Sequence, residues 1–371
     1  MDNLTHSLFG LTLARTPLNR AGRGATVALL LASNAPDIDI VTTAGGALKY
    51  LEWHRGPTHG LLGIIGLGLA TAGVVTAGTK LIDARTGRAD APPKFWPLAL
   101  LSMVGILFHI LMDLPTSYGT RPLSPFAWTW FTTDWLPIVD VYLLAILAGG
   151  LWLDLRAPRR GVIVALTLTV AFYALRATTH QIAIERAPAV FGAMIPARCD
   201  GATEPFLVSA WPRGADPHAP NAPASPCLKE IAAIPDMLSP FRWRLLAQLS
   251  DSYESREIDL LPGSTDATAP LVSTRYPNQW PEPVMTAATS HVGRVFLGFA
   301  RFPAARFIHE TDGRTTVRWS DLRFVMAPSR NSQPGSGFAT GAGSGFFSAT
   351  VSVGADGKIL SEQLGIPTTH Q

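Results

Sequence analysis

The first half of the chain is dominated by long apolar runs with almost no charged residue. Four runs are long enough to be membrane helices, because about 20 apolar residues cross the hydrocarbon core of a bilayer. They are residues 61–79, 95–112, 135–153, in which Asp140 is the one charged residue, and 161–175. Only 15% of the whole chain is charged, against about 25% in an average soluble domain. The pattern predicts an α-helical, multi-pass membrane bundle with four clear spans.

Two shorter apolar segments precede these spans, at residues 4–14 and 26–32. Neither is long enough to cross a bilayer alone, and a turn with Arg15, Arg20 and Arg23 joins them. We therefore expect an N-terminal helical hairpin that dips into the bundle with its basic tip toward the cytoplasm, since such hairpins are tolerated where protein surrounds them. Two tilted full spans are the alternative.

The chain changes character near residue 185, beyond which Pro, Asn, Ser and charged residues are scattered and no long apolar run occurs. The expected division is a helical membrane domain over residues 1–184 and a small, mainly β extramembrane domain over residues 185–371. Alternating apolar residues predict strands at 244–249, 255–261, 294–301 and 315–326, and strands around a hairpin turn at 345–360. A stretch rich in Pro and Ala, 211–226, predicts an extended loop.

Basic residues in the short loops set the expected orientation, because Lys and Arg stay on the cytoplasmic side. They are Lys80, Arg85, Arg88 and Lys94 in one loop and Arg156, Arg159 and Arg160 in another. The second domain should then lie outside the cytoplasm, on a bacterial-type inner membrane. Cys199 and Cys227 both fall in that domain. A disulfide is permitted in an oxidising compartment, and two free thiols fit the spacing equally well.

Polar residues gather at the membrane face opposite these basic loops. They are His6, Asn34, Asp37, Asp39, His54, Arg55, His59, His109, Asp113 and Asp134. These residues are far apart in sequence, but the alternation of spans brings them to similar depth at the ends of different helices. Helical bundles assemble metal sites in this way.

Three local spacings sharpen the picture. His109 and Asp113 lie one turn apart and share a helix face. The sequence Asn-Ala-Pro-Asp-Ile-Asp at 34–39 ends a helix at its proline and places two carboxylates there. The sequence His-Arg-Gly-Pro-Thr-His at 54–59 places two imidazoles around a tight turn.

Each of these residues also has an ordinary structural explanation. A lone His on an apolar helix is more often a hydrogen-bonded core group than a ligand, and an acid beside a helix end is often a cap. An ionisable residue inside a membrane segment is costly, however, and indicates function. The combination therefore favours a metal site. Its mixed nitrogen and oxygen donors suit zinc, manganese or iron better than calcium.

The segments MDNLTH, NAPDID, HRGPTHG, HILMD and SYGTRPLSPF together resemble the YdjM-like family of LexA-regulated, inner-membrane, metal-dependent hydrolases. The resemblance spans roughly residues 1–160 and, more loosely, the tail. It implies a membrane location and a metal site more directly than it implies a particular reaction.

A weaker likeness runs to the group of zinc-dependent phospholipases C and P1-type nucleases. Those all-helical enzymes use an early His, an Asp, a further His and a His-x-x-x-Asp pair, an order that His6, Asp37, His59, His109 and Asp113 follow. The trinuclear centre of that group needs a second His-x-x-x-Asp pair, and this sequence has none after Asp113. One or two divalent ions, zinc or manganese, are therefore expected here.

These considerations assign a role to each candidate residue. The expected metal ligands are His6, Asp37, His59, His109 and Asp113. Asp39 or His54 would act as a base or orient a ligand. Arg55 and Arg121 would hold an anionic group. The sequence has no Gly-x-Ser-x-Gly elbow and no Cys in its first half, so serine or cysteine nucleophiles have no support.

The sequence thus favours a membrane-embedded, metal-dependent hydrolase that acts at the non-cytoplasmic face. Its position favours an amphiphilic substrate, a phosphodiester or a lipid-linked ester, drawn from membrane lipid. The alternatives are a non-catalytic membrane scaffold with a structural metal and a transporter for a metal or protons. A formal charge of +3, without a basic stripe interleaved with aromatics, argues against a nucleic-acid partner.

Overall fold

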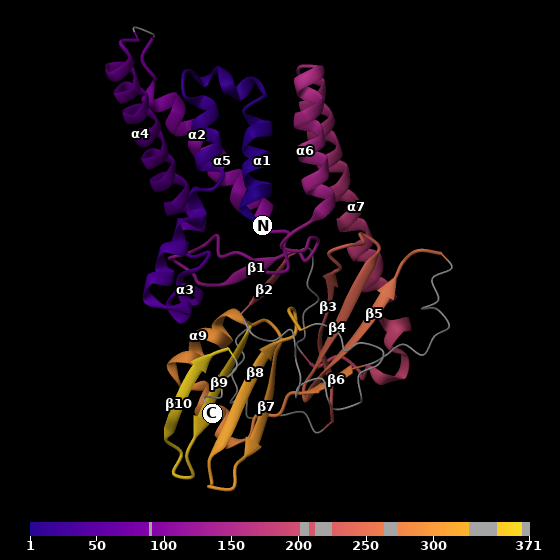
Figure 1. Ribbon diagram of the computed structural model, residues 1–371. Coiled ribbons are helices and arrows are strands. Elements are labelled where there is room, and N and C mark those ends of the chain that lie inside the picture. Colours follow the sequence, from indigo (N-terminus) through magenta and orange to yellow (C-terminus); the bar gives the residue numbers. More distant parts are fainter. Residues whose placement is uncertain (89–90, 201–207, 212–224, 263–273, 326–346, 366–371) are drawn as a thin grey trace. The chain divides into compact units, whose positions relative to one another are not determined.

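The computed structural model describes residues 1–88, 91–200, 208–211, 225–262, 274–325 and 347–365 (Figure 1). The chain divides into two compact units. The first unit comprises Met1–Thr42, Trp53–His180 and Pro235–Pro240. The second comprises Thr43–Glu52, Gln181–Ile234 and Phe241–Gln371.

The first unit begins with two short helices, α1 (Asn3–Leu13) and α2 (Ala25–Ala32), which pack against each other. Helix α1 starts where it does because the Asp2 carboxylate accepts a hydrogen bond from the Thr5 backbone N–H at 2.9 Å, an N-cap that satisfies a free donor of the first turn. The two helices and the turn between them match the segments expected at 4–14 and 26–32.

Three helices of the described chain are long and apolar enough to cross a membrane. They are α4 (Leu61–Thr86), α5 (Phe95–Asp113) and α7 (Arg160–Phe191), whose last residues belong to the second unit. Helix α2 and the 3-10 segment Ala35–Gly45 meet at a 44° bend, and together they are apolar enough to form a broken span or a re-entrant loop. These helices give the first unit the composition of a membrane protein.

The fourth expected span, residues 135–153, is shorter than its apolar run suggested. It corresponds to α6 (Val141–Arg156), which has 16 residues. The helix cannot start earlier because the Asp140 side chain caps it, accepting hydrogen bonds at 3.0 Å from the backbone N–H groups of Tyr142 and Leu143. The total number of spans therefore stays a prediction.

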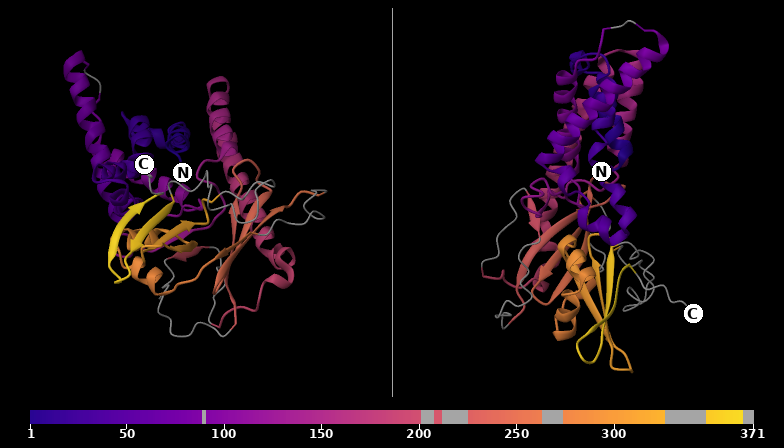
Figure 2. Two further views of the ribbon diagram at one scale, coloured as in Figure 1. Left: turned by 60° about the horizontal axis from the view of Figure 1, so that its bottom comes forward. Right: turned by 90° about the vertical axis from the view of Figure 1, so that its left-hand side faces the viewer.

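Small residues let the helices of the first unit approach one another closely. A Cβ on Gly68 of α4 would run into Met103 of α5, and one on Gly105 of α5 would come within 2.9 Å of the Ala32 side chain. Helices in membranes commonly pack through such small residues. Helices α1, α2, α4 and α5 consequently lie side by side, as two views show (Figures 1 and 2).

The ends of these helices meet three irregular segments. The 3-10 segment that follows α2, the turn between α3 (Ala47–Trp53) and α4, and the loop after α5 all lie in or next to this end of the first unit. In that loop Thr120 pairs with Phe131, which belongs to the short strand β1 (Trp130–Thr132). These segments carry every residue expected at the metal site except those on helices α1 and α5.

The second unit contains two four-stranded sheets and the short strand β2 (Ser209–Trp211). The first sheet has the order β3 (Leu228–Pro235), β4 (Arg242–Leu249), β5 (Ser252–Asp259), β6 (Thr274–Pro277). The second has the order β10 (Ile359–Leu364), β9 (Ser348–Val353), β8 (Thr315–Asp321), β7 (Pro303–His309). Buried residues of both sheets, among them Leu246, Tyr253 and Ala304, form a shared core. The expected β character of this half of the chain is confirmed.

One expected strand is wrong. Residues 294–301 were expected to be extended, but helix α9 (His291–Phe299) follows α8 (Glu282–Ala288) here. The Ser290 side chain caps α9 by accepting a hydrogen bond from the Gly293 N–H at 2.9 Å. Its buried residues Val292, Phe296 and Phe299 recur at helical spacing. Val, Phe and Leu favour strands locally, and packing of one helical face against the second sheet overrides that preference.

Two other expectations fall partly outside the described residues. Most of the loop expected at 211–226 does so, since residues 212–224 are not described. The hairpin expected at 345–360 is confirmed as β9 and β10, and residues 345 and 346 lie outside the described chain.

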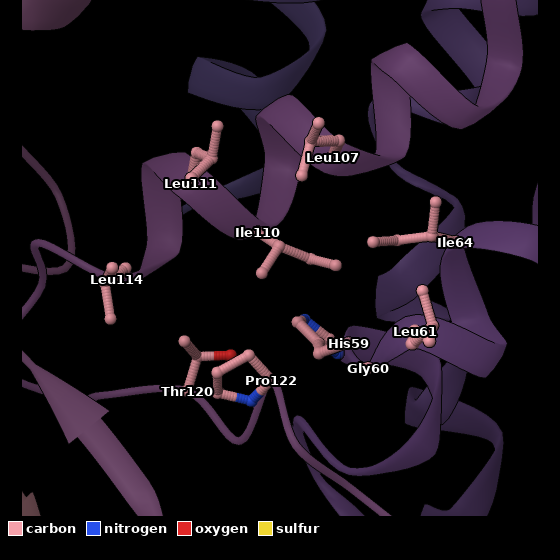
Figure 3. Close-up of a pocket in the computed structure, with 10 residues that line it drawn as sticks. All are labelled: His59, Gly60, Leu61, Ile64, Leu107, Ile110, Leu111, Leu114, Thr120 and Pro122. Atoms are coloured by element: carbon pink, nitrogen blue, oxygen red, sulfur yellow. The ribbon is translucent and has the colours of Figure 1, made fainter.

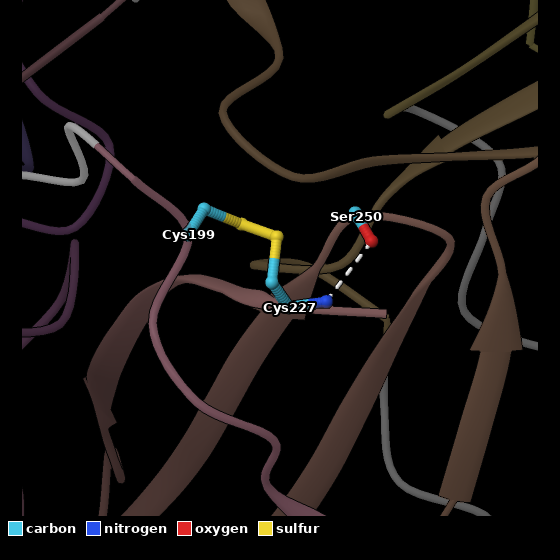
Figure 4. The surroundings of a disulfide bond; sticks show 3 residues. All are labelled: Cys199, Cys227 and Ser250. Carbon is cyan, nitrogen blue, oxygen red and sulfur yellow. Dashed lines mark hydrogen bonds between the residues drawn. A yellow bond between two sulfur atoms is a disulfide. The ribbon is translucent and has the colours of Figure 1, made fainter. Parts of the chain in front are cut away.

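Cys199 and Cys227 form a disulfide, with their Cα atoms 5.0 Å apart (Figure 4). The backbone N–H of Cys227 donates a hydrogen bond to Ser250 Oγ at 3.2 Å. The bond ties the segment that follows α7 to the start of the first sheet. Of the two possibilities left open by the spacing, the structure therefore shows the disulfide.

Candidate metal centre

The five residues expected to bind metal come together in the first unit. They form two overlapping groups, His6, His109 and Asp113, and Asp37, His59 and His109. Within each group one donor atom of every residue lies within 4.8 Å of the others. His109 belongs to both groups, so the two form one continuous cluster, which we call the His–Asp cluster.

Donor atoms of four residues converge at short and similar separations. His59 Nε2 lies 3.2 Å from His109 Nε2. Asp113 Oδ2 lies 3.4 Å from each of these nitrogens. Asp37 Oδ1 lies 3.7 Å from His59 Nε2 and 3.6 Å from His109 Nε2. Zinc bonds to nitrogen and oxygen of about 2.0–2.2 Å place the ligands of a tetrahedral ion roughly 3.3–3.5 Å apart. The observed separations are close to this spacing, so residues of each group could be ligands of a small divalent ion.

A backbone carbonyl determines which ring nitrogen of His109 carries the proton. Its Nδ1 lies 2.8 Å from the carbonyl oxygen of Ser33. A carbonyl only accepts hydrogen bonds, so Nδ1 carries the proton and donates it. Nε2 is then bare and faces the carboxylate of Asp113, which is also an acceptor. Metal-binding imidazoles are commonly oriented by this kind of bond from the other ring nitrogen.

His59 has a comparable arrangement on the other side of the cluster. Its Nδ1 lies 3.0 Å from Thr58 Oγ1 and 3.8 Å from Asp39 Oδ2. A hydroxyl and a carboxylate beside Nδ1 are compatible with a proton on Nδ1, the tautomer that leaves Nε2 bare. Burial lowers the pKa of His59 to about 3, so the imidazole is neutral at physiological pH. Neutral imidazole is the form that binds a metal.

Asp113 is held through one of its two oxygens. Arg55 Nη2 lies 3.0 Å from Asp113 Oδ1, and the amino group of Met1 also contacts this oxygen. Arg55 Nη1 donates to the Gly119 carbonyl at 2.7 Å, which fixes the guanidinium. Asp113 Oδ2 makes no hydrogen bond within the described chain. Arg55 therefore orients the carboxylate, whose second oxygen faces the histidines.

His6 lies against the same cluster from helix α1. Its ring stacks on the His109 ring with centroids 3.8 Å apart, and its Nε2 lies 3.5 Å from Asp113 Oδ1. Neither ring nitrogen makes a hydrogen bond of ordinary geometry in the described chain, although the side chain is buried. Buried polar atoms are nearly always hydrogen-bonded, so these atoms suit a ligand.

Asp39 and His54 lie one step outside the two groups. Asp39 Oδ2 accepts a hydrogen bond from the Arg55 backbone N–H at 2.7 Å and lies 3.1 Å from His54 Nδ1. Burial lowers the pKa of His54, which keeps it neutral as well. Asp39 therefore contacts residues at both ends of the turn at 54–59. This geometry suits either of the roles expected for it, a base or an orienting group.

Arg121 is placed differently from Arg55. Its guanidinium packs over the rings of Trp128 and Trp130, at 4.7 and 4.4 Å from their centroids. It also donates a hydrogen bond to the His54 carbonyl. These contacts fix the turn that carries His54. Binding of an anionic group by Arg121 stays a prediction.

Asn34 and Asp134 of the expected polar face also lie outside both ligand groups. The Asn34 amide donates to the Leu30 carbonyl at 2.9 Å and to Ser7 Oγ at 3.1 Å. Asp134 is buried, and its backbone N–H donates to Thr132 Oγ1 at 2.9 Å. Sequence reasoning missed the carbonyls of Ser33 and Gly119, because a backbone acceptor has no residue-type signal.

A helical membrane unit with a buried His–Asp cluster is thus the class of protein that fold and site define. Residues 1–183 match the model of the family described as YdjM inner membrane protein. The match covers all five residues of the cluster.

One curated relative is "Uncharacterized protein YfhP" of Bacillus subtilis (strain 168). It is 22% identical over 186 residues, which are 47% of this chain and 54% of the relative. The chain therefore spans about half the length of this curated relative. No solved structure matches the chain significantly.

Proposed function

We propose that this protein is a membrane-embedded, metal-dependent hydrolase acting on a phosphodiester or a lipid-linked ester. One observation carries the proposal: the Nε2 atoms of His59 and His109 lie 3.2 Å apart, and each lies 3.4 Å from Asp113 Oδ2, within the buried His–Asp cluster. A buried cluster of facing acceptors is unfavourable unless a cation lies among them. The ligand set fits one divalent ion, zinc or manganese, with His6 available to a second.

Such an ion, when bound, lowers the pKa of a bound water and polarises an ester or phosphoryl oxygen. The chain supplies the surroundings of this chemistry. Arg55 fixes Asp113 and compensates its charge, while His109 is fixed by the Ser33 carbonyl. Asp39 is placed to accept a proton or to hold His59 in its tautomer. The Asp37 side chain is 17% exposed, so water and substrate would reach the cluster beside Asp37.

The proposed location is a bacterial-type inner membrane with the second unit outside the cytoplasm. Basic residues between the long helices support this orientation. The disulfide between Cys199 and Cys227 supports it independently, because disulfides persist in oxidising compartments.

Hydrolysis by the reconstituted full-length protein tests the proposal. Vesicles with zinc- or manganese-loaded protein would be given bis(p-nitrophenyl) phosphate and a fluorogenic phospholipid. We expect turnover that falls at least 100-fold in His109→Ala. Asp83→Asn is the matched control, because Asp83 is an acid of the same unit that pairs with Arg23 at 2.7 Å and not with the cluster.

Two results would contradict the hydrolase function and favour an alternative function. Stoichiometric metal without hydrolysis, with loss of folding in His109→Ala, would make the metal structural and the protein a scaffold. Movement of metal ions or protons across the vesicle membrane, abolished in His109→Ala, would make it a transporter.

A further inference from the structure

A pocket of about 270 Å³ lies beside the His–Asp cluster (Figure 3). Its walls are almost entirely apolar, with Leu61 and Ile64 of α4 on one side and Leu107, Ile110 and Leu111 of α5 on another. Small-ligand pockets usually measure about 300–1,000 Å³. The space is therefore suited to part of a long apolar group rather than to a whole large molecule.

The pocket reaches the outer surface of two helices that are apolar enough to span a membrane. Leu61, Leu107 and Leu111 at its rim are 58%, 42% and 47% exposed. Exposed leucines on a membrane helix face lipid chains rather than water. An apolar group can therefore enter sideways from the bilayer without crossing water.

The pocket shares one residue with the candidate metal centre. His59 lines the pocket, and the Nε2 atom of the same imidazole lies 3.2 Å from His109 Nε2 in the cluster. Thr120 adds one hydroxyl to the lining. An occupant would thus have its apolar part between α4 and α5 and its polar end at the donor atoms.

We propose that this pocket binds a hydrocarbon chain of a membrane lipid that is the substrate of the centre. That the lipid is a substrate rests on the proposed function. Binding of its hydrocarbon chain in the pocket does not depend on turnover. A lipid ester or phosphodiester carries its reactive group next to its hydrocarbon chain, which matches an apolar pocket that His59 lines. The pocket then selects lipids over water-soluble phosphodiesters.

Photolabelling measures the occupant directly. Full-length protein in vesicles would receive a trace of phosphatidylethanolamine with a diazirine in one acyl chain, and labelled peptides would be mapped after irradiation. We expect at least fivefold more label on residues 107–114 than around Leu100, which is 64% exposed on the same helix and does not line the pocket.

Ile64→Trp fills the pocket and should remove that enrichment, and Leu107→Trp serves as a second variant should the first fail to fold. Leu100→Trp is the matched control and should retain the enrichment. Metal content should be equal in all of them, since none of these side chains belongs to the cluster. In an active protein, Ile64→Trp should raise KM for the phospholipid at least fivefold and leave bis(p-nitrophenyl) phosphate unaffected.

Equal labelling of both regions in the wild type would mean that the label comes only from surrounding bilayer lipid. This result would overturn the proposal that the pocket binds a lipid chain, even if hydrolysis were found. Enrichment that persists unchanged in Ile64→Trp and Leu107→Trp would overturn it too. Enrichment that is lost in these variants, without hydrolysis of any substrate, would support binding of a lipid chain in the pocket and contradict the hydrolase function.

Discussion

Both units bury charged side chains, but they satisfy them differently. In the second unit donors meet acceptors: Arg301 Nη2 donates to Glu230 Oε1 at 2.6 Å, and Arg323 donates to Asp321 Oδ2 from Nε at 2.9 Å. The first unit has such pairs too, but in its His–Asp cluster ring nitrogens and a carboxylate oxygen converge: His59 Nε2 and His109 Nε2 lie 3.2 Å apart, and each lies 3.4 Å from Asp113 Oδ2.

This difference separates a structural network from a ligand site. A buried ion pair with complete hydrogen bonds needs nothing further from outside the protein. Converging bare nitrogens and carboxylate oxygens repel each other unless a cation is present. The second unit should therefore be insensitive to metal, and the stability of the first should depend on it.

Breaking a pair in the second unit should have the largest effect. Glu230→Ala leaves the Arg301 guanidinium buried without its carboxylate, and both side chains are only 3% exposed. We expect a loss of about 3–5 kcal/mol in the free energy of unfolding, measured by thermal unfolding of the full-length protein in detergent. Arg242→Ala removes a 55% exposed partner of Asp259 and should cost about 0.5 kcal/mol or less. Equal losses in the two variants would contradict the structural role of the buried pair.

Removing the metal should affect the first unit alone. An ion that binds the folded state adds about 4 kcal/mol at a free concentration a thousand times its Kd. We expect a chelator to lower the melting temperature of wild-type protein but not that of Asp113→Asn, which lacks the Oδ2 donor. A chelator effect of the same size in both proteins would place the stabilising ion elsewhere.

Cutting the disulfide should destabilise the second unit without touching the centre. Cys199→Ser with Cys227→Ser opens a loop of 28 residues and should lower stability by about 2–4 kcal/mol. Metal content should stay as in the wild type. Loss of metal in this double variant would contradict the prediction that metal binding by the first unit does not depend on the disulfide of the second.

The smallest expected effect is at Arg55. Its guanidinium spans Asp113 and the Gly119 carbonyl, and a lysine ammonium cannot reproduce that fork. Arg55→Lys should weaken metal binding about 10- to 100-fold, as titration with a competing chelator would show. Arg176→Lys is the control: Arg176 is buried in the same unit but pairs with Asp140 at 3.5 Å. Unchanged affinity in Arg55→Lys would remove Arg55 from the centre.

The membership of the cluster could be predicted from the sequence. Asp37, His59 and His109 lie far apart in the chain, but alternating helices bring the ends of non-adjacent segments together. The spacing of His109 and Asp113 on one helix face added a local signal. The partners that orient these side chains could not be predicted, because the Ser33 and Gly119 carbonyls are backbone groups that any residue would provide.

Other features could not be predicted because packing decides them. Helix α9 contains strand-forming residues, and only the burial of Val292, Phe296 and Phe299 on one face distinguishes it from a strand. The pocket beside His59 depends on the separation of α4 and α5, which their apolar sequences do not determine.

Metal content is the most direct test of the central claim that the His–Asp cluster is a ligand site. Full-length protein purified in detergent, never exposed to chelator, would be measured by inductively coupled plasma mass spectrometry beside His109→Ala, Asp113→Asn and the control Asp83→Asn. The account predicts one or two zinc or manganese ions per chain in the wild type and in Asp83→Asn, and almost none in folded His109→Ala and Asp113→Asn. Absence of stoichiometric metal from the wild type would contradict it and make the cluster a buried polar network.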